Sequence, residues 1–191
     1  NRPVELERNV RSILKSEFKD YEIIISDDKS PKQDEIQAVV STFLEHDNIR
    51  FFRQKTNLGE PANKNFLVQQ ASGKYNIILG DDDTLADGAL GFLFKFIESY
   101  PKFDIYGFGY EIVNEVNQPL SRHCSTKVVD FRKRSSRLKL LEGGVIPMAL
   151  FHPATFCCRS GLEQELPYRN DVGIGEDLCF LLQANIKRKS I

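Results

Sequence analysis

KYNIILGDDDTL, residues 74–85, is the part of the sequence that says most about the fold. Its apolar run, residues 75–79, has the length and composition of a buried β-strand. Gly80 and three adjacent carboxylates, Asp81, Asp82 and Asp83, follow the run directly. Ligands bind at the carboxyl ends of strands in open α/β sheets, and such oxygen ligands suit Mg²⁺ or Mn²⁺. The stretch therefore indicates a cation site at a strand end, and the plain alternative is a solvated acidic turn that caps the next helix.

Composition is that of one globular domain. Hydrophobic residues make up 41% and charged residues 28% of the 191 positions, and the net charge of −1 implies no general affinity for nucleic acid. No apolar run approaches the ~20 residues that span a bilayer, and no signal peptide is evident. The four cysteines lack the spacing of metal ligands, which favours free thiols in a reducing cytosol.

Helices and strands alternate over the first hundred residues. Apolar spacing predicts strands at 21–26, 49–53 and 75–79, and helices at 3–18, 31–44, 62–71 and 87–100. This alternation implies a mostly parallel sheet with helices on both faces. The first helix has no strand before it and the chain stops just after a predicted helix, so we expect a piece cut at both ends from a longer protein.

Beyond Pro101 the pattern becomes α+β. The expected elements are strands at 104–113, 127–131 and 154–158, a loop at 166–175, and helices at 132–141 and 174–186.

Two of the predicted parallel strands, 21–26 and 75–79, end in acidic clusters. Because the carboxyl ends of parallel strands share one edge, Asp27 and Asp28 can face the same cleft as the carboxylates after residue 80. Some carboxylates can accept hydrogen bonds from a base or a ribose, while others hold a metal that neutralises a diphosphate. Neither Gly-x-Gly-x-x-Gly nor Gly-x-x-x-x-Gly-Lys-Ser/Thr is present, so dinucleotide and P-loop binding lack support.

The order of the motifs resembles that of the family 2 glycosyltransferases over nearly the whole chain. The motifs are Asn1-Arg2, Ser12-Ile13-Leu14, Tyr21-Glu22-Ile23-Ile24-Ile25, Asp27-Asp28-x-Ser30, Asn57-x-Gly59, Ala62-x-x-Asn65, Ser72-Gly73-Lys74-Tyr75, Asp81-Asp82-Asp83 and Glu176-Asp177. The resemblance implies a single α/β domain of the GT-A fold, with a mostly parallel central sheet. It divides the domain into a nucleotide-sugar-binding half, residues 1–100, and a smaller α+β acceptor half, residues 101–191.

The resemblance also implies the reaction and its residues. A sugar moves with inversion from a nucleotide-diphosphate sugar to an acceptor hydroxyl, with Mg²⁺ or Mn²⁺ as cofactor. Asp177 corresponds to the general base, and Asp82 and Asp83 to the metal ligands. Residues expected to bind the nucleotide-sugar are Asn1, Arg2, Asp27, Asp28, Asn57, Lys64, Asp81 and Asp82. Within this set Asp28, with Asp27 beside it, corresponds to the turn that holds the nucleobase.

The expected donor is a UDP-sugar, and the expected acceptor is a glycan or glycolipid of polysaccharide or lipopolysaccharide synthesis, with no nucleic-acid partner. The enzyme is expected in the cytoplasm, with peripheral attachment to the inner membrane face only through regions outside this sequence. The chain departs from the family pattern at two positions: Gly80 replaces the first Asp of the Asp-x-Asp-Asp form, and Lys64 replaces an Arg. The tryptophan of the acceptor motif is also missing.

Other functions fit parts of the sequence. A phosphatase of the haloacid dehalogenase type also places Asp-x-Asp after an apolar strand, as in Asp81-x-Asp83, but it needs Thr or Val where Leu85 stands. A nucleotidyltransferase is closer in fold, although its glycine-rich loop is missing. A non-catalytic nucleotide-sugar-binding module would keep the acidic clusters as structure alone, and Asp177 argues against it. Asp27 and Asp28 also fit a simple Asx-turn before the helix at Pro31.

Overall fold

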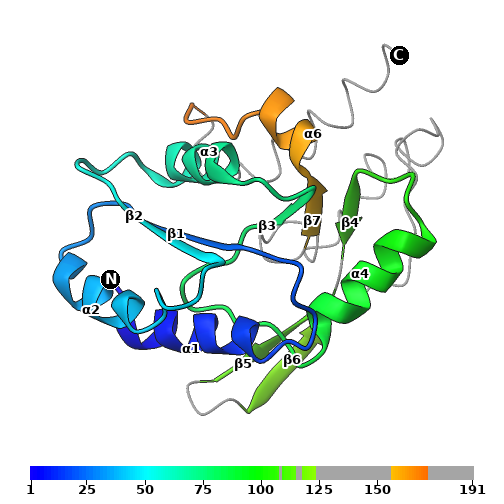
Figure 1. Ribbon diagram of the computed structural model, residues 1–191, viewed down its shortest axis with the longest axis horizontal. Coiled ribbons are helices and arrows are strands. Elements are labelled where there is room, and N and C mark those ends of the chain that lie inside the picture. Colours follow the sequence, from blue (N-terminus) through cyan, green and yellow to red (C-terminus); the bar gives the residue numbers. More distant parts are fainter. Residues whose placement is uncertain (108, 115–117, 124–155, 172–191) are drawn as a thin grey trace.

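The computed structural model describes residues 1–107, 109–114, 118–123 and 156–171 (Figure 1). Helices and strands alternate in its first hundred residues, as the sequence predicts. The elements are α1 (Pro3–Leu14), β1 (Ile23–Asp27), α2 (Gln33–Ser41), β2 (Ile49–Arg53), α3 (Glu60–Gln70), β3 (Tyr75–Ile77), α4 (Ala89–Ser99), β4 (Ile105–Gly107), β5 (Tyr110–Val113), β6 (Pro119–His123), β7 (Phe156–Arg159) and α6 (Ser160–Glu165).

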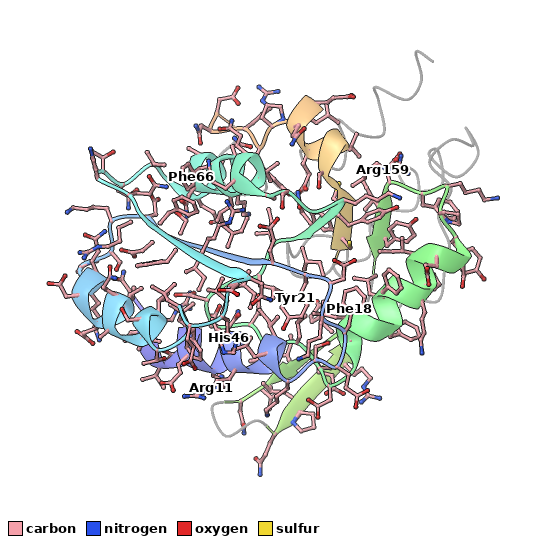
Figure 2. All side chains as sticks on the ribbon, viewed as in Figure 1. Arg11, Phe18, Tyr21, His46, Phe66 and Arg159 are labelled. Atoms are coloured by element: carbon pink, nitrogen blue, oxygen red, sulfur yellow. The ribbon has the colours of Figure 1, made fainter. Side chains whose placement is uncertain are left out.

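β1 and β2 form a parallel pair whose register aligns Asp27 with Arg53. Their connection contains α2, because parallel strands need a crossover. Figure 1 shows α1 and α2 on one face of this pair and α3 on the other. Tyr21, just before β1, donates its hydroxyl hydrogen to the carbonyl of Ile13 in α1 at 3.4 Å (Figure 2). The parallel pair with helices on both faces confirms the α/β class.

A first hydrophobic cluster lies between this strand pair and helices α1 and α2. In α1, the buried Leu6, Val10 and Ile13 follow the spacing of one helical face. The other buried members are Ile23, Ile36, Val40, Phe43 and Ile49. Leu79 and Leu85, which flank the acidic turn (residues 80–83), pack against the same cluster. Both ends of the acidic turn are therefore anchored in the core.

The second sheet has the order β3-β7-β4, and β7 pairs antiparallel with both neighbours. β3 and β4 therefore run in the same direction. The second hydrophobic cluster of the molecule involves this sheet and contains Val68, Phe156, Cys158, Leu166 and Tyr168. Cys157 and Cys158, in β7, are buried free thiols.

The elements after residue 100 differ from those expected. The predicted strand 104–113 is wrong as one element, because β4 ends at Gly107 and β5 begins at Tyr110. β5 pairs antiparallel with β6, which the sequence did not suggest because residues 119–123, PLSRH, carry one apolar side chain besides the proline. The short helix α6 was also missed.

Some expected elements fall elsewhere or differ in length. The strand at 127–131 and the helices at 132–141 and 174–186 lie outside the described residues. β3 is shorter than the expected strand 75–79. No helix in the described ranges combines the length and apolar character needed to cross a membrane.

Candidate functional site

The acidic turn closes on itself through Asp83. The Asp83 carboxylate accepts a hydrogen bond from the Gly80 N–H at 3.1 Å, and the Asp83 N–H donates to the Gly80 carbonyl at 3.3 Å. A Cβ added at Gly80 would lie 3.0 Å from carboxylate oxygens of both Asp82 and Asp83. Glycine therefore leaves room for this turn, which gives a physical reason for the departure from the family pattern at this position. The role of Asp83 as a metal ligand stays a prediction.

Arg2 binds both of the other carboxylates of the turn. Its Nη2 and Nε donate to the two oxygens of Asp81 at 2.5 and 3.2 Å, and its Nη1 donates to Asp82 at 2.5 Å. The hydrogen bond to Asp81 is the main reason that the pKa of Arg2 is raised above its ordinary value. The structure thus brings together three of the expected donor-binding residues, which are 79 and 80 positions apart in sequence.

Helix α1 holds the acidic turn at further points. The side-chain amide of the buried Asn9 donates to the Gly80 carbonyl at 2.7 Å, and the Leu85 N–H donates to the Ser12 hydroxyl at 3.0 Å. Arg8 lies 3.5 Å from the Asp82 carbonyl oxygen. Sequence reasoning gave no role to Asn9, although a polar residue within the apolar face of a helix was a usable signal.

Asp28 organises a second group of expected donor residues. Its two oxygens accept hydrogen bonds from the backbone N–H groups of Leu58 at 2.7 Å and Gly59 at 2.9 Å. The Gly59 N–H also donates to the Asn57 side chain at 3.0 Å, and Gly59 has a φ of +83°, a conformation that favours glycine. Asp28 and Asn57 are therefore brought together by one loop.

Asp27 is buried beside that loop. One of its oxygens accepts a hydrogen bond from the Ser30 N–H at 3.3 Å, which is the turn chemistry offered as the simpler alternative. Its Oδ2 is buried and has no hydrogen-bond partner among the described residues. A buried carboxylate oxygen of this kind is costly unless it is paired.

Lys64 lies apart from the acidic turn, on α3. Its side chain is buried, with Nζ 2.9 Å from Glu60 and 5.5 Å from the centroid of the Tyr168 ring. Ser26, in β1, donates its hydroxyl hydrogen to the side-chain oxygen of Asn63 in α3 at 2.6 Å. Asn1 is exposed, and the expected general base Asp177 lies outside the described residues.

A buried polar cluster that sequence reasoning missed ties α3 and β3 to α6. The Asn65 side chain exchanges two hydrogen bonds of 2.8 Å with the backbone of Tyr168. Glu163 accepts hydrogen bonds from Asn76 at 2.7 Å and from the Tyr168 hydroxyl at 3.0 Å. Burial raises the pKa of Glu163 to about 7. The cluster therefore fixes the segment after α6 against the helix that carries Lys64.

The carboxylates of the acidic turn fit a hard cation. In the ranges that the structure describes, no three His, Cys, Asp or Glu side chains are grouped to hold a metal. Asp81 and Asp82 nevertheless supply oxygen ligands of the kind that Mg²⁺ prefers, and both already bind one cationic group, Arg2. Mg²⁺ usually keeps several waters and binds substrate phosphates as well. The carboxylate ligands of the acidic turn thus suit a metal ion that is held partly by the protein and partly by a diphosphate.

Comparisons with known proteins give the same picture. The family model described as Glycosyl transferase family 2 matches residues 1–160. A GalNAc(5)-diNAcBac-PP-undecaprenol beta-1,3-glucosyltransferase from Campylobacter jejuni is 42% identical over 97 residues, which are 50% of this chain and 31% of that protein. An uncharacterized glycosyltransferase from Rickettsia felis is 32% identical over 106 residues, or 56% of this chain and 17% of that protein.

Two solved structures share the fold. TarS 1-349 of S. aureus in complex with UDP has a TM-score of 0.71 and 19% identity, covering 95% of this chain and 51% of that one. Mannosyltransferase PcManGT from Pyrobaculum calidifontis, in complex with GDP-Man and Mn²⁺, has a TM-score of 0.63 and 16% identity, covering 93% and 47%. The chain thus spans about half of these structures and a third or less of the curated relatives.

Proposed function

Because this chain belongs to glycosyl transferase family 2 and has the GT-A fold, we propose that it transfers a sugar from a nucleotide-diphosphate sugar to an acceptor hydroxyl, with inversion. The observation that carries this proposal is the acidic turn after β3. Asp81 and Asp82 lie together at the surface and share one cationic partner, so the turn presents oxygen ligands of the kind that a metal-bound diphosphate uses.

Base recognition belongs to the turn after β1. An ionised carboxylate offers about four lone-pair sites, so Asp28 can hold the loop at Leu58 and Gly59 and still accept a hydrogen bond from a base N–H. Asp27 lies beside it, with one buried oxygen that makes no hydrogen bond within the part of the chain that the structure describes. The donor we propose is a UDP-sugar, and the UDP complex of the similar TarS supports a uridine nucleotide.

The acidic turn binds the diphosphate end of the donor. If Mg²⁺ or Mn²⁺ were held there, it would supply the positive charge that neutralises a leaving diphosphate. Asp82 and Asp83 are the predicted ligands that would hold it, and Asp81, which shares the Arg2 guanidinium with Asp82, is a further candidate ligand. The Mn²⁺ complex of the similar PcManGT supports a divalent cation.

The acceptor side is assigned by similarity and by the sequence motif. The Campylobacter relative is named for a lipid-linked saccharide, so we propose a glycan or glycolipid acceptor and work at the inner membrane face from the cytoplasm. Asp177, at the predicted start of a helix, is the proposed general base that removes the proton of the acceptor hydroxyl.

A thermal-shift panel tests this function. UDP-sugars and GDP-sugars are added to the full chain with and without Mn²⁺, because a ligand that binds the folded state raises Tm by mass action. We expect one nucleotide-sugar to raise Tm, and to do so more strongly with Mn²⁺. Release of free sugar from that donor then separates an enzyme from a binding module, and no shift with any nucleotide-sugar would contradict the proposal.

A further inference from the structure

The Arg2 guanidinium occupies the place that a cation would take in the acidic turn. Its three nitrogens reach both oxygens of Asp81 and one oxygen of Asp82. Metal coordination at this turn would use the same oxygens. A guanidinium and a divalent cation that approach the same carboxylates repel each other, so each weakens the binding of the other there.

The position of Arg2 is fixed by the fold. Pro3 begins α1 directly after Arg2, and Asn9 and Ser12 of that helix are hydrogen-bonded to the segment containing the acidic turn. The helix itself packs into the first hydrophobic cluster. Arg2 is therefore held near the two carboxylates by a helix whose apolar face is buried.

The contact is also weak enough to be exchanged. The side chains of Arg2, Asp81 and Asp82 are 50%, 34% and 48% exposed. Ion pairs with this much solvent around them contribute little and can be replaced by a stronger partner. A nucleotide diphosphate would supply such a partner, because Arg binds phosphate oxygens through paired hydrogen bonds.

We propose that Arg2 is a built-in counter-ion of the donor site: its guanidinium holds Asp81 and Asp82 until a divalent cation replaces it, and it then pairs with the diphosphate. This inference rests on the proposed function, since it requires a donor that carries a diphosphate. The proposal predicts that the metal and the diphosphate each raise the affinity of the site for the other. Metal alone must compete with Arg2, whereas the diphosphate gives the released guanidinium a new partner, so each ligand favours the other.

The test measures binding of Mn²⁺ alone, and of UDP with Mn²⁺, to the full chain by titration calorimetry. Arg2→Gln removes the competitor, so Mn²⁺ alone is expected to bind about threefold to tenfold more tightly than to wild type. The same variant is expected to bind UDP in the presence of Mn²⁺ less tightly. A change that merely loosened the site would weaken both, so the opposite signs identify the counter-ion role.

Matched variants complete the test. Arg11→Gln removes an arginine of the same helix that pairs with Glu7 and lies at the lower edge of α1 in Figure 2, and it is expected to behave as wild type. Arg2→Lys keeps one positive charge without the fork and is expected to fall between wild type and Arg2→Gln. Equal Tm values without ligand show that each variant is folded.

The outcomes separate the two proposals. Unchanged or weaker binding of Mn²⁺ alone to Arg2→Gln overturns the counter-ion proposal, and the proposed function survives if wild type still binds UDP with Mn²⁺. A wild-type chain that binds neither Mn²⁺ nor UDP overturns both.

Discussion

Asp82 is the residue whose replacement tests the metal most directly. Asp82→Asn keeps the shape of a half-exposed side chain and removes its charge, so stability should change by less than about 1 kcal/mol. Loss of a metal ligand should weaken Mn²⁺-dependent UDP binding at least about tenfold. Calorimetric titration with and without Mn²⁺ measures the effect.

Asp87→Asn, an exposed carboxylate just outside the acidic turn, is the control for Asp82→Asn. Equal Mn²⁺ dependence in Asp82→Asn and wild type would leave the turn as a solvated acidic turn without a metal. It does not cap α4, whose N-cap is Gly88.

Asp28 gives a second residue-level prediction. Asp28→Ala removes the acceptor proposed for the base and also releases the backbone N–H groups of Leu58 and Gly59. We expect UDP and a UDP-sugar to be weakened by the same ~1–3 kcal/mol, because both carry the base. Competition binding with the two ligands measures this. Weakening of the UDP-sugar alone would place Asp28 at the sugar.

At the scale of elements, α6 is held to β3 by the buried Glu163 carboxyl, whose pKa lies near neutral pH. Burial raises the pKa of Glu163 from 4.5 to about 7, so the folded chain keeps a proton that the unfolded chain has released. The stability from Glu163 is therefore fully present below pH 4.5 and is lost as pH rises through about 7. Over this range the loss amounts to about 3 kcal/mol.

Glu163→Gln should remove this pH dependence. Urea unfolding at pH 4.5 and at pH 8 is expected to show the variant gaining about 3 kcal/mol relative to wild type between the two conditions. Glu165→Gln, at an exposed position of the same helix, is the control. Parallel pH profiles for wild type and Glu163→Gln would mean that the cluster relaxes when Glu163 ionises.

The elements predicted correctly are those with a local signal. α1 to α4 and β1 to β3 follow from apolar periodicity, and β2 was predicted with its observed bounds. The strand expected at 154–158 is observed as β7, Phe156–Arg159. Its antiparallel pairing with β3 and β4 joins distant segments, which periodicity does not report, and the polar β6 was missed. Gly107 and Gly109 lie where the expected strand 104–113 is divided into β4 and β5, and these two glycines were the sequence signal for that break.

At the scale of the whole molecule, the site was predicted as residue types and not as contacts. Strand ends and motif order pointed to Asp28, Asp81 and Asp82. The partners of these residues, however, come from α1 and from the loop after β2. The hydrogen bond from Asn76 to Glu163 joins residues 87 positions apart, and no sequence pattern predicts such a contact.

The two hydrophobic clusters give a prediction for the expected single domain. Val40, fully buried in the first cluster, and Val68, buried in the second, are each replaced by Ala. Each change should cost about 1–3 kcal/mol through lost burial and a cavity. One urea transition shifted by both substitutions is expected, and two transitions, each moved by one substitution, would divide the chain into two domains.

The place of β7 has a consequence for how the protein is made. In the described residues β3 pairs only with β7, which comes much later in the chain. Synthesis begins at the N-terminus and adds about 5–20 residues per second. A nascent chain can thus assemble the first cluster early, but the strand that leads into the acidic turn waits for residues 156–159 to leave the ribosome. β3 gains its sheet partner only after residues 101–159 exist, so in a half-made chain the proposed nucleotide-sugar site lacks the support of this sheet.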